Sequence, residues 1–266
     1  MEYILERESC MKLVATDFDG TFCSYGGGVP EKNLAAVRKW QEAGHKFGIN
    51  TGRGISLIDM EIEKYEGLAP DFLICNNGAV VTDGERNILA SLRFPQALTA
   101  GVLQLLREKR GDAPMLVVTE RESLAIGGNL SDAALGLPDM PSTTQEKAMR
   151  RDDIVQISLN CGTQENALAV EAMVHASFPQ LRGNINRGYL DLNLVEADKK
   201  NGVARLLQVT GWQVAEGDLF VIGDDRNDLP AIEAYHGYTV ATAPDFMKKA
   251  AKKVYESVAQ MMLENL

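Results

Sequence analysis

Two aspartates, Asp17 and Asp19, stand directly after a short apolar segment, in the sequence Lys-Leu-Val-Ala-Thr-Asp-Phe-Asp-Gly-Thr (residues 12–21). Apolar and β-branched residues that lead into a glycine-bearing loop predict a buried strand ending just before Asp17. Side chains of an extended chain alternate between its two faces, so residues two apart point the same way. Two carboxylates this close repel each other unless a cation, a proton or a substrate lies between them. The pair therefore predicts a chemical site at a strand end, with Gly20 and Thr21 beside it.

An Asp-x-Asp-Gly pattern without partners is more typical of a turn, in which the carboxylates accept hydrogen bonds from their own backbone. A calcium-binding EF-hand loop is excluded, because Phe22 and Gly28 stand where that loop has its glycine and its glutamate. A catalytic interpretation of the pair thus depends on further polar groups elsewhere in the chain.

Other predicted strands also end in polar residues or glycine. Strands are expected at residues 45–50 and 71–75, and they run into Thr51-Gly52-Arg53 and Asn76-Asn77-Gly78. Helices are expected between the strands, at residues 30–44 and 55–65, and this alternation predicts a parallel sheet with right-handed crossovers. Ligands of such sheets bind beyond the carboxyl ends of the strands. The Thr51 hydroxyl and the Gly52 N–H could hold a phosphoryl oxygen there, although Thr-Gly-Arg alone is more often a helix cap.

A second acidic cluster follows a strand expected at residues 218–222, in the sequence Gly-Asp-Asp-Arg-Asn-Asp (residues 223–228). Three carboxylates within five residues need neutralising, and Mg²⁺ prefers oxygen ligands. Lys199 or Lys200 begins the helix before this strand, where a cation is disfavoured by the helix dipole. A lysine at that position is more often surface, but it also suits an anion bound nearby.

The pattern changes near Gly84 and returns to the parallel type after Glu196. Short strands, a hairpin at 183–194 and two long helices predict an α+β domain inserted into the first one. We therefore expect an N-terminal extension at residues 1–10, a catalytic core at 11–83 and 195–266, and an inserted cap domain at 84–194. Polar cap residues near the hairpin are expected on its surface, namely Asn184, Asn186, Arg187 and Asn193.

Composition limits the class of protein. The chain has 266 residues and a formal net charge of −10, so a nucleic-acid backbone is not an expected partner. Its four cysteines lack C-x-x-C spacing, which favours reduced thiols and a cytoplasmic location. No apolar run reaches the roughly 18 residues of a membrane span, and the N-terminus is too acidic for a signal peptide. A membrane is therefore not an expected partner either, and the oligomeric state is left open.

Taken in order, Asp-Phe-Asp-Gly-Thr, Thr-Gly-Arg, the lysine region and Gly-Asp-Asp-Arg-Asn-Asp resemble the four motifs of the haloacid dehalogenase-like phosphatases. The large insert between the second and third motifs, and the segment at residues 72–79, resemble the Cof-like branch of that superfamily. The resemblance covers residue 12 to about residue 254. It implies an α/β fold, with a Rossmann-like parallel sheet as core and an inserted α+β cap domain.

The resemblance also implies residue roles. Asp17 would be the nucleophile that forms an aspartyl-phosphate, and Asp19 would be general acid and then general base. Mg²⁺ would lie between the Asp17 carboxylate, the Asp19 backbone carbonyl and Asp224, with Asp228 at or behind the metal. The residues expected to bind the substrate are Thr51, Gly52, Arg53, Asn77, Lys199 and Asn227.

The third motif departs from the usual pattern because two lysines are candidates. The alignment of Gly202, Val203 and Leu206 with the helix that follows favours Lys199 over Lys200. The expected protein is a Mg²⁺-dependent phosphatase of a small phosphorylated metabolite, with a sugar phosphate favoured. A phosphomutase of the same superfamily and a non-catalytic regulator that binds a phosphate ligand are the alternatives. A haloalkanoate dehalogenase is disfavoured, since its chemistry needs neither Asp19 nor the metal.

Overall fold

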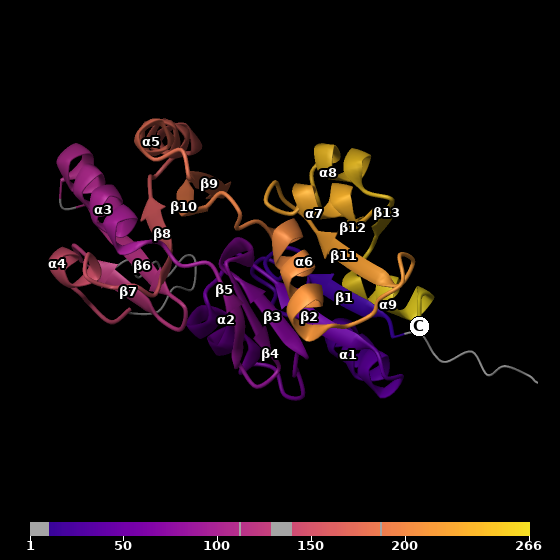
Figure 1. Cartoon of the computed structure of the whole chain (residues 1–266). Helices are drawn as coiled ribbons and strands as arrows, with labels where there is room; N and C mark the ends of the chain where they lie inside the picture. The colour runs from indigo at the N-terminus through magenta and orange to yellow at the C-terminus, as the bar shows by residue number, and fades with distance from the viewer. Residues whose placement is uncertain (1–10, 112, 129–139, 187) are drawn as a thin grey trace, which may run out of the picture.

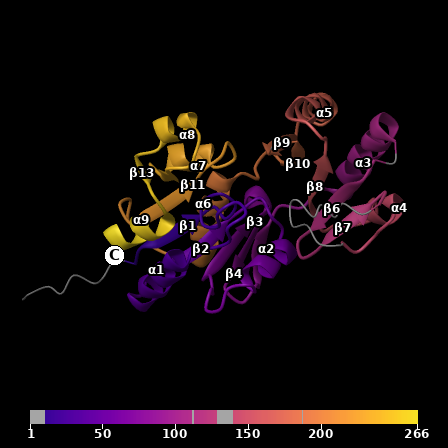
Figure 2. The ribbon, with the colours of Figure 1, turned by 180° about the vertical axis from the view of Figure 1, so that it is seen from behind.

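Two β-sheets organise the chain into two lobes, which Figures 1 and 2 show from opposite sides. The computed structural model describes residues 11–111, 113–128, 140–186 and 188–266. We call the lobe around the larger sheet the core lobe. The lobe around the smaller sheet, with β6–β10 and α3–α5, is the cap lobe. The expected N-terminal extension at residues 1–10 lies outside the described residues.

The core lobe contains an eight-stranded sheet with the order β13-β12-β11-β1-β2-β3-β4-β5. The six strands from β13 to β3 run parallel, whereas β4 and β5 are antiparallel to their neighbours. This α/β arrangement confirms the predicted fold class. The strands are β1 (Leu13–Thr16), β2 (Lys46–Asn50), β3 (Phe72–Cys75), β4 (Val80–Asp83), β5 (Ile88–Ser91), β11 (Leu219–Gly223), β12 (Tyr238–Val240) and β13 (Lys253–Tyr255).

The central strand β1 is apolar throughout because both of its faces are buried. Val14 packs into the cluster that includes α1 and α2, whereas Leu13 and Ala15 pack into the cluster that includes α6. A strand covered on both sides has a continuous apolar run, as parallel sheets usually require. The core-lobe helices are α1 (Glu31–Glu42), α2 (Ile55–Ile62), α6 (Lys199–Thr210), α7 (Leu229–Ala234), α8 (Asp245–Ala250) and α9 (Val258–Glu264), with a 3₁₀ turn, η1, at Asn76–Gly78.

The cap lobe contains an antiparallel sheet with the order β7-β6-β8-β10-β9. One face carries the apolar side chains that pack under α3 and α5, among them Ile157 and Leu190. The other face is turned toward the core lobe, with Ser158 and Asp191 on it. The cap elements are α3 (Gln96–Arg110), β6 (Met115–Thr119), β7 (Ser123–Ile126), α4 (Gln145–Ala148), β8 (Ile154–Asn160), α5 (Gln164–Ser177), β9 (Leu181–Asn186) and β10 (Tyr189–Leu194).

Strand β5 belongs to the core sheet, although the sequence pattern placed everything after residue 83 in the insert. Val80 of β4 pairs with Ser91 of β5, so the core sheet continues past the expected boundary. The reason is that η1 turns the chain back beside β3, and two antiparallel strands then extend the sheet edge. We propose that the cap domain starts after Ser91 rather than at residue 84.

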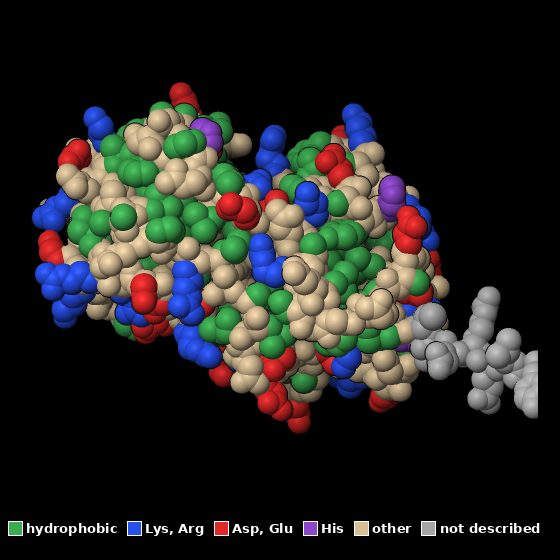
Figure 3. Space-filling model, in the orientation of Figure 1, with side chains coloured by type: hydrophobic (Ala, Val, Ile, Leu, Met, Phe, Trp, Pro, Cys, Tyr) green, Lys and Arg blue, Asp and Glu red, His purple; other side chains and the backbone are tan. Residues whose placement is uncertain are grey.

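The outer surface carries mixed charges. On the face in Figure 3, acidic and basic side chains are scattered over both lobes without a large patch of one sign. In the part of the chain that the structure describes, no helix combines the length and apolarity needed to cross a membrane.

Candidate active site

The carboxylates of Asp17, Asp224 and Asp228 meet at the carboxyl ends of β1 and β11. These two strands are parallel neighbours, and the Asp17 N–H donates to the Ile222 carbonyl at 2.8 Å. One oxygen from each of the three carboxylates lies within 4.8 Å of the others. The parallel pairing of the strands therefore brings the first and fourth sequence motifs together.

Lys199 lies between two of these carboxylates. Its ammonium nitrogen is 2.6 Å from Asp17 Oδ1 and 2.6 Å from Asp228 Oδ1, and its side chain is only 1% exposed. Burial lowers the pKa of Lys199, but the two aspartates outweigh burial and raise it above its usual range. Lys199 is therefore a fixed cation in the site, whereas Lys200 is partly exposed.

The start of α6 directs Lys199 into the site. Asp198 is the N-cap of this helix, and its carboxylate accepts the Asn201 N–H at 2.6 Å. Arg182 of β9 pairs with the same carboxylate at 3.2 Å, so the cap lobe also contacts this helix start. A capped first turn fixes the direction of the following side chain, which explains how a lysine is held at an otherwise unfavourable helix position.

The loop after β11 folds around the Asp228 carboxylate. Asp228 Oδ2 accepts the N–H groups of Asp224 and Asp225 at 3.2 and 3.1 Å. Thr21 donates its hydroxyl to Asp224 Oδ1 at 2.7 Å. Gly20 has φ +92°, and a Cβ atom there would overlap the Asp224 carboxylate. The two motif loops are thus packed so closely that only glycine fits at this position.

The cluster has more negative than positive charge. Burial raises the pKa of Asp17 well above its ordinary value, while the nearby Lys199 opposes that rise. Burial also raises the pKa of Asp224 to about 6, and the Thr21 hydrogen bond opposes it. Three carboxylates and one ammonium leave an excess of negative charge, and every available ligand is an oxygen. This donor set suits a hard divalent cation such as Mg²⁺.

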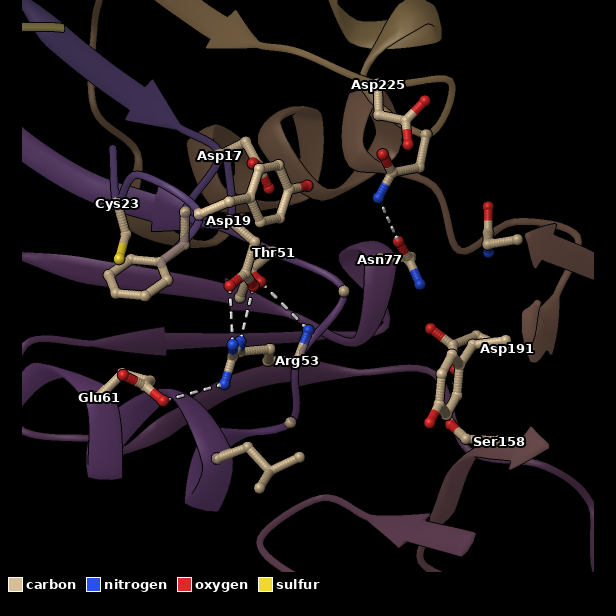
Figure 4. Close-up of a pocket in the computed structure, with 18 of the residues that line it drawn as sticks. Asp17, Asp19, Cys23, Thr51, Arg53, Glu61, Asn77, Ser158, Asp191 and Asp225 are labelled. Atoms are coloured by element: carbon tan, nitrogen blue, oxygen red, sulfur yellow. Dashed lines mark hydrogen bonds and ion pairs between the residues drawn. The ribbon is translucent and has the colours of Figure 1, made fainter. Parts of the chain in front are cut away.

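Arg53 forms an ion pair with the carboxylate of Asp19. Its Nε and Nη2 atoms donate to the two Asp19 oxygens at 2.6 and 2.7 Å, and its Nη1 lies 3.4 Å from Glu61 (Figure 4). A bidentate arginine–carboxylate pair fixes the orientation of both groups. The sequence expectation that Arg53 binds the substrate did not anticipate this partner. Nothing in the local Thr-Gly-Arg sequence identifies Asp19 as the acceptor.

Thr51, Asn77 and Asn227 lie near the same pocket. Thr51 is buried, and its hydroxyl accepts the Arg53 N–H at 3.2 Å. Asn227 donates its side-chain amide to Asn77 Oδ1 at 3.1 Å, so the loops after β11 and β3 are joined (Figure 4). Asn77 has φ +53°, a left-handed conformation that asparagine tolerates better than most residues. Gly52 lies beside Asn77, since a Cβ there would be 3.2 Å from its Oδ1 atom.

Asn193 is buried between the lobes, so its expected place on the hairpin surface is wrong. Its side-chain amide donates to the backbone carbonyls of Asn76 and Val155 at 3.3 and 3.2 Å. Asn184 is partly buried and donates to Asn193 Oδ1 at 3.1 Å. The sequence signal that was overlooked is the alternation along 189–194, in which polar residues alternate with leucines. Arg187 and the Asn186 side chain lie outside what the structure describes.

These residues surround a pocket of about 660 Å³ between the lobes. The core lobe supplies the aspartates, Thr51 and Arg53, and the cap lobe supplies residues of β6, β8, β9 and β10. Three cap residues that belong to none of the sequence motifs also line the pocket, namely Ser158, Tyr189 and Asp191. The pocket size suits a small metabolite.

Comparisons with known proteins agree with this architecture. Residues 14–261 match the family model described as haloacid dehalogenase-like hydrolase. A Mycoplasma pneumoniae protein named "Putative phosphatase" is 26% identical, and the match covers 93% of this chain and 91% of that protein.

Two solved structures share the fold at low sequence identity. A HAD subclass IIB sugar phosphatase is 21% identical with a TM-score of 0.79, and the match covers 96% of this chain and 99% of that one. A haloacid dehalogenase-like hydrolase from B. subtilis is 20% identical with a TM-score of 0.80, covering 96% and 100%. The family match spans both lobes and all four motifs, and the chain therefore belongs to the haloacid dehalogenase-like hydrolases.

Proposed function

We propose that the protein is a Mg²⁺-dependent phosphatase that hydrolyses a small phosphorylated metabolite, with a sugar phosphate favoured, through an aspartyl-phosphate intermediate. The observation that carries this proposal is the contact of Lys199 with Asp17 and Asp228, next to Asp224, at the edge of a pocket between two lobes. The phosphatase name of a relative and of a structural neighbour supports it.

In the first step, an Asp17 carboxylate oxygen attacks phosphorus while the bond from phosphorus to the ester oxygen breaks. Asp19, once one of its oxygens has separated from Arg53 and taken up a proton, donates that proton to the leaving oxygen, and the product alcohol departs. In the second step, Asp19 takes a proton from water as the water oxygen attacks phosphorus. The bond to Asp17 breaks, so inorganic phosphate is released and both aspartates return to their starting state.

Fixed polar groups would stabilise the charge on the transferring group. Lys199 is held at 2.6 Å from the attacking carboxylate, and Thr51 and Asn227 lie beside the same pocket. Preorganised donors of this kind lower the barrier because they need no reorientation during the reaction. Asp17, Asp224 and Asp228 would hold Mg²⁺, which when bound neutralises charge on the phosphoryl oxygens.

Removal of divalent cations is expected to abolish hydrolysis of p-nitrophenyl phosphate, and added Mg²⁺ is expected to restore it. Mg²⁺ should also raise the melting temperature, because a ligand at 100 times its Kd stabilises the folded state by about 2.7 kcal/mol. Asp224→Asn should reduce that thermal shift, whereas the neighbouring control Asp225→Asn should retain it. Full turnover in excess chelator would contradict the metal assignment.

Replacing Arg53 with alanine is expected to slow alkyl phosphates more than aryl phosphates. Arg53 orients Asp19, and a leaving alkoxide needs the proton of Asp19 whereas nitrophenolate does not. We expect kcat for an alkyl phosphate to fall about 10- to 100-fold. Steady-state kinetics on both esters check this, with Lys64→Ala, which removes the other basic partner of Glu61, as control. Equal losses for both esters through KM would instead indicate that Arg53 binds the phosphoryl group.

A further inference from the structure

One face of the cap sheet forms the pocket wall contributed by the cap lobe. On β10, Leu190 and Leu192 pack into the cap core, whereas Asp191 between them lines the pocket. Its register partners on the neighbouring strands are Ser158 on β8 and Asn184 on β9, and both line the pocket as well. The cap sheet buries its apolar face under the helices, so its stability does not require polar groups on the opposite face.

Asp191 is the one charged side chain that the cap lobe contributes to the described lining of this pocket. Its Oδ1 accepts the Ser158 hydroxyl at 2.7 Å. Within the described part of the chain, no basic side chain forms an ion pair with this carboxylate. Burial raises the pKa of Asp191 to about 6, and hydrogen bonds from Ser158 and Asn77 oppose that rise. Because the Asp191 carboxylate lines the pocket and has no ion-pair partner among the described residues, its oxygens can accept further hydrogen bonds from a ligand there.

Apolar groups lie on the same wall. Leu116 and Val118 of β6 form a small buried cluster on this side of the cap sheet, and Tyr189 also lines the pocket. A sugar ring presents C–H groups on its faces and hydroxyls at its edge, so it matches a wall that combines apolar surface with hydrogen-bond acceptors. An aromatic side chain beside polar partners suits the same amphipathic shape.

We propose that Asp191 accepts hydrogen bonds from hydroxyl groups of the leaving group, so that the enzyme selects phosphate esters of neutral polyhydroxylated compounds. This inference rests on the proposed phosphatase function. It also predicts selection against a second phosphate or carboxylate on the substrate. The described cap lining has no basic residue for such a group, and Asp191 would repel it.

The test compares an aldohexose 6-phosphate with n-hexyl phosphate, which has six carbons but no hydroxyls, and with p-nitrophenyl phosphate. We expect Asp191→Ala to lower kcat/KM for the sugar phosphate by about 10- to 100-fold, mainly through KM, as for a hydrogen bond to a charged group. The other two esters should change less than about threefold. The exposed cap carboxylate Asp152 provides the control variant Asp152→Asn, which should leave all three unchanged.

Thermal unfolding and calorimetry separate an effect of Asp191 on substrate binding from an effect on folding. Asp191→Asn should melt at the same temperature as the native protein or higher, because an amide avoids the cost of a partly buried charge. The affinity for the sugar phosphate, measured by calorimetry, should weaken in Asp191→Ala, which makes the test independent of turnover.

Equal losses for all three esters would overturn the inference. A preference of the native enzyme for hexosamine 6-phosphate would also overturn it, because that preference would indicate an ammonium ligand. Failure of the native enzyme to hydrolyse p-nitrophenyl phosphate would contradict the proposed function instead.

Discussion

Asp17→Asn is expected to form no phosphoenzyme with any substrate, and its hydrolysis rate should fall by several orders of magnitude. The amide nitrogen and oxygen of asparagine are poor nucleophiles. Among the described residues, Asp17 is the carboxylate at the end of β1 that accepts a hydrogen bond from Lys199. Trapping of the phosphoenzyme, followed by mass measurement, checks the first part. Single-turnover kinetics check the second.

Asp19→Asn provides the matched comparison, because it retains the nucleophile and removes the acid and base. An alkyl phosphate, whose leaving oxygen needs a proton, should then react very slowly. p-Nitrophenyl phosphate needs no such proton, so its first step should survive better than the attack of water in the second. A burst of nitrophenol followed by a slow phase is therefore expected in Asp19→Asn and not in Asp17→Asn. A burst in Asp17→Asn, or identical burst-free rates in both variants, would show that the two roles are assigned wrongly.

Lys199→Ala is expected to lower kcat/KM by at least two orders of magnitude, which corresponds to about 3 kcal/mol of transition-state stabilisation. The variant loses the ammonium group that lies between Asp17 and Asp228, and the attacking carboxylate then loses both its orientation and this charge partner. Lys200→Ala should cost little, because that side chain is partly exposed. Steady-state kinetics of the two variants decide between the lysines.

The same variant is expected to destabilise the fold, because it leaves two buried carboxylates without their ammonium. Removal of one partner from a buried ion pair costs about 3–5 kcal/mol. Lys199→Met keeps most of the side-chain volume and separates the loss of charge from the cavity. Thermal unfolding with and without Mg²⁺ measures both effects, and Mg²⁺ should recover part of the lost stability. A normal kcat/KM in a folded Lys199→Met protein would remove Lys199 from the mechanism.

The parallel strands β1, β2, β3 and β11 of the core lobe and the helices α1, α2 and α6 were predictable because their signals are local. β1, β3 and β11 are short, mostly apolar runs that end at polar or glycine-bearing segments, and β2 alternates Phe47 and Ile49 with other residues before Thr51. The alternation of strands and helices then restricts the topology, since crossovers of parallel strands are right-handed. Because parallel strands have their carboxyl ends at the same edge of the sheet, the polar residues after β1, β2 and β11 are predicted to lie together there.

The partners of the charged side chains depend on contacts between distant segments, which local sequence does not specify. Lys199 bonds to Asp17 across 182 positions, and Arg53 bonds to Asp19 across 34. An arginine can reach several acceptors from one backbone position, so the chosen carboxylate depends on where α2 packs beside β1. The three-dimensional structure therefore decided that Arg53 pairs with Asp19 at the wall of the pocket.

The boundary between the lobes was also decided by tertiary structure. Two asparagines with φ +53° in the turn at Asn76–Gly78 reverse the chain, and β4 and β5 then extend the core sheet beyond residue 83. Likewise, the alternation along β10 was present in the sequence, but only the packing of α3 and α5 shows which face is covered. By itself, the sequence determined the strands β1, β2, β3 and β11, the helices between them and the chemical motifs. The tertiary structure determined that Asp191 faces the pocket and Asn193 is buried, because a strand has two faces and its neighbours select the covered one.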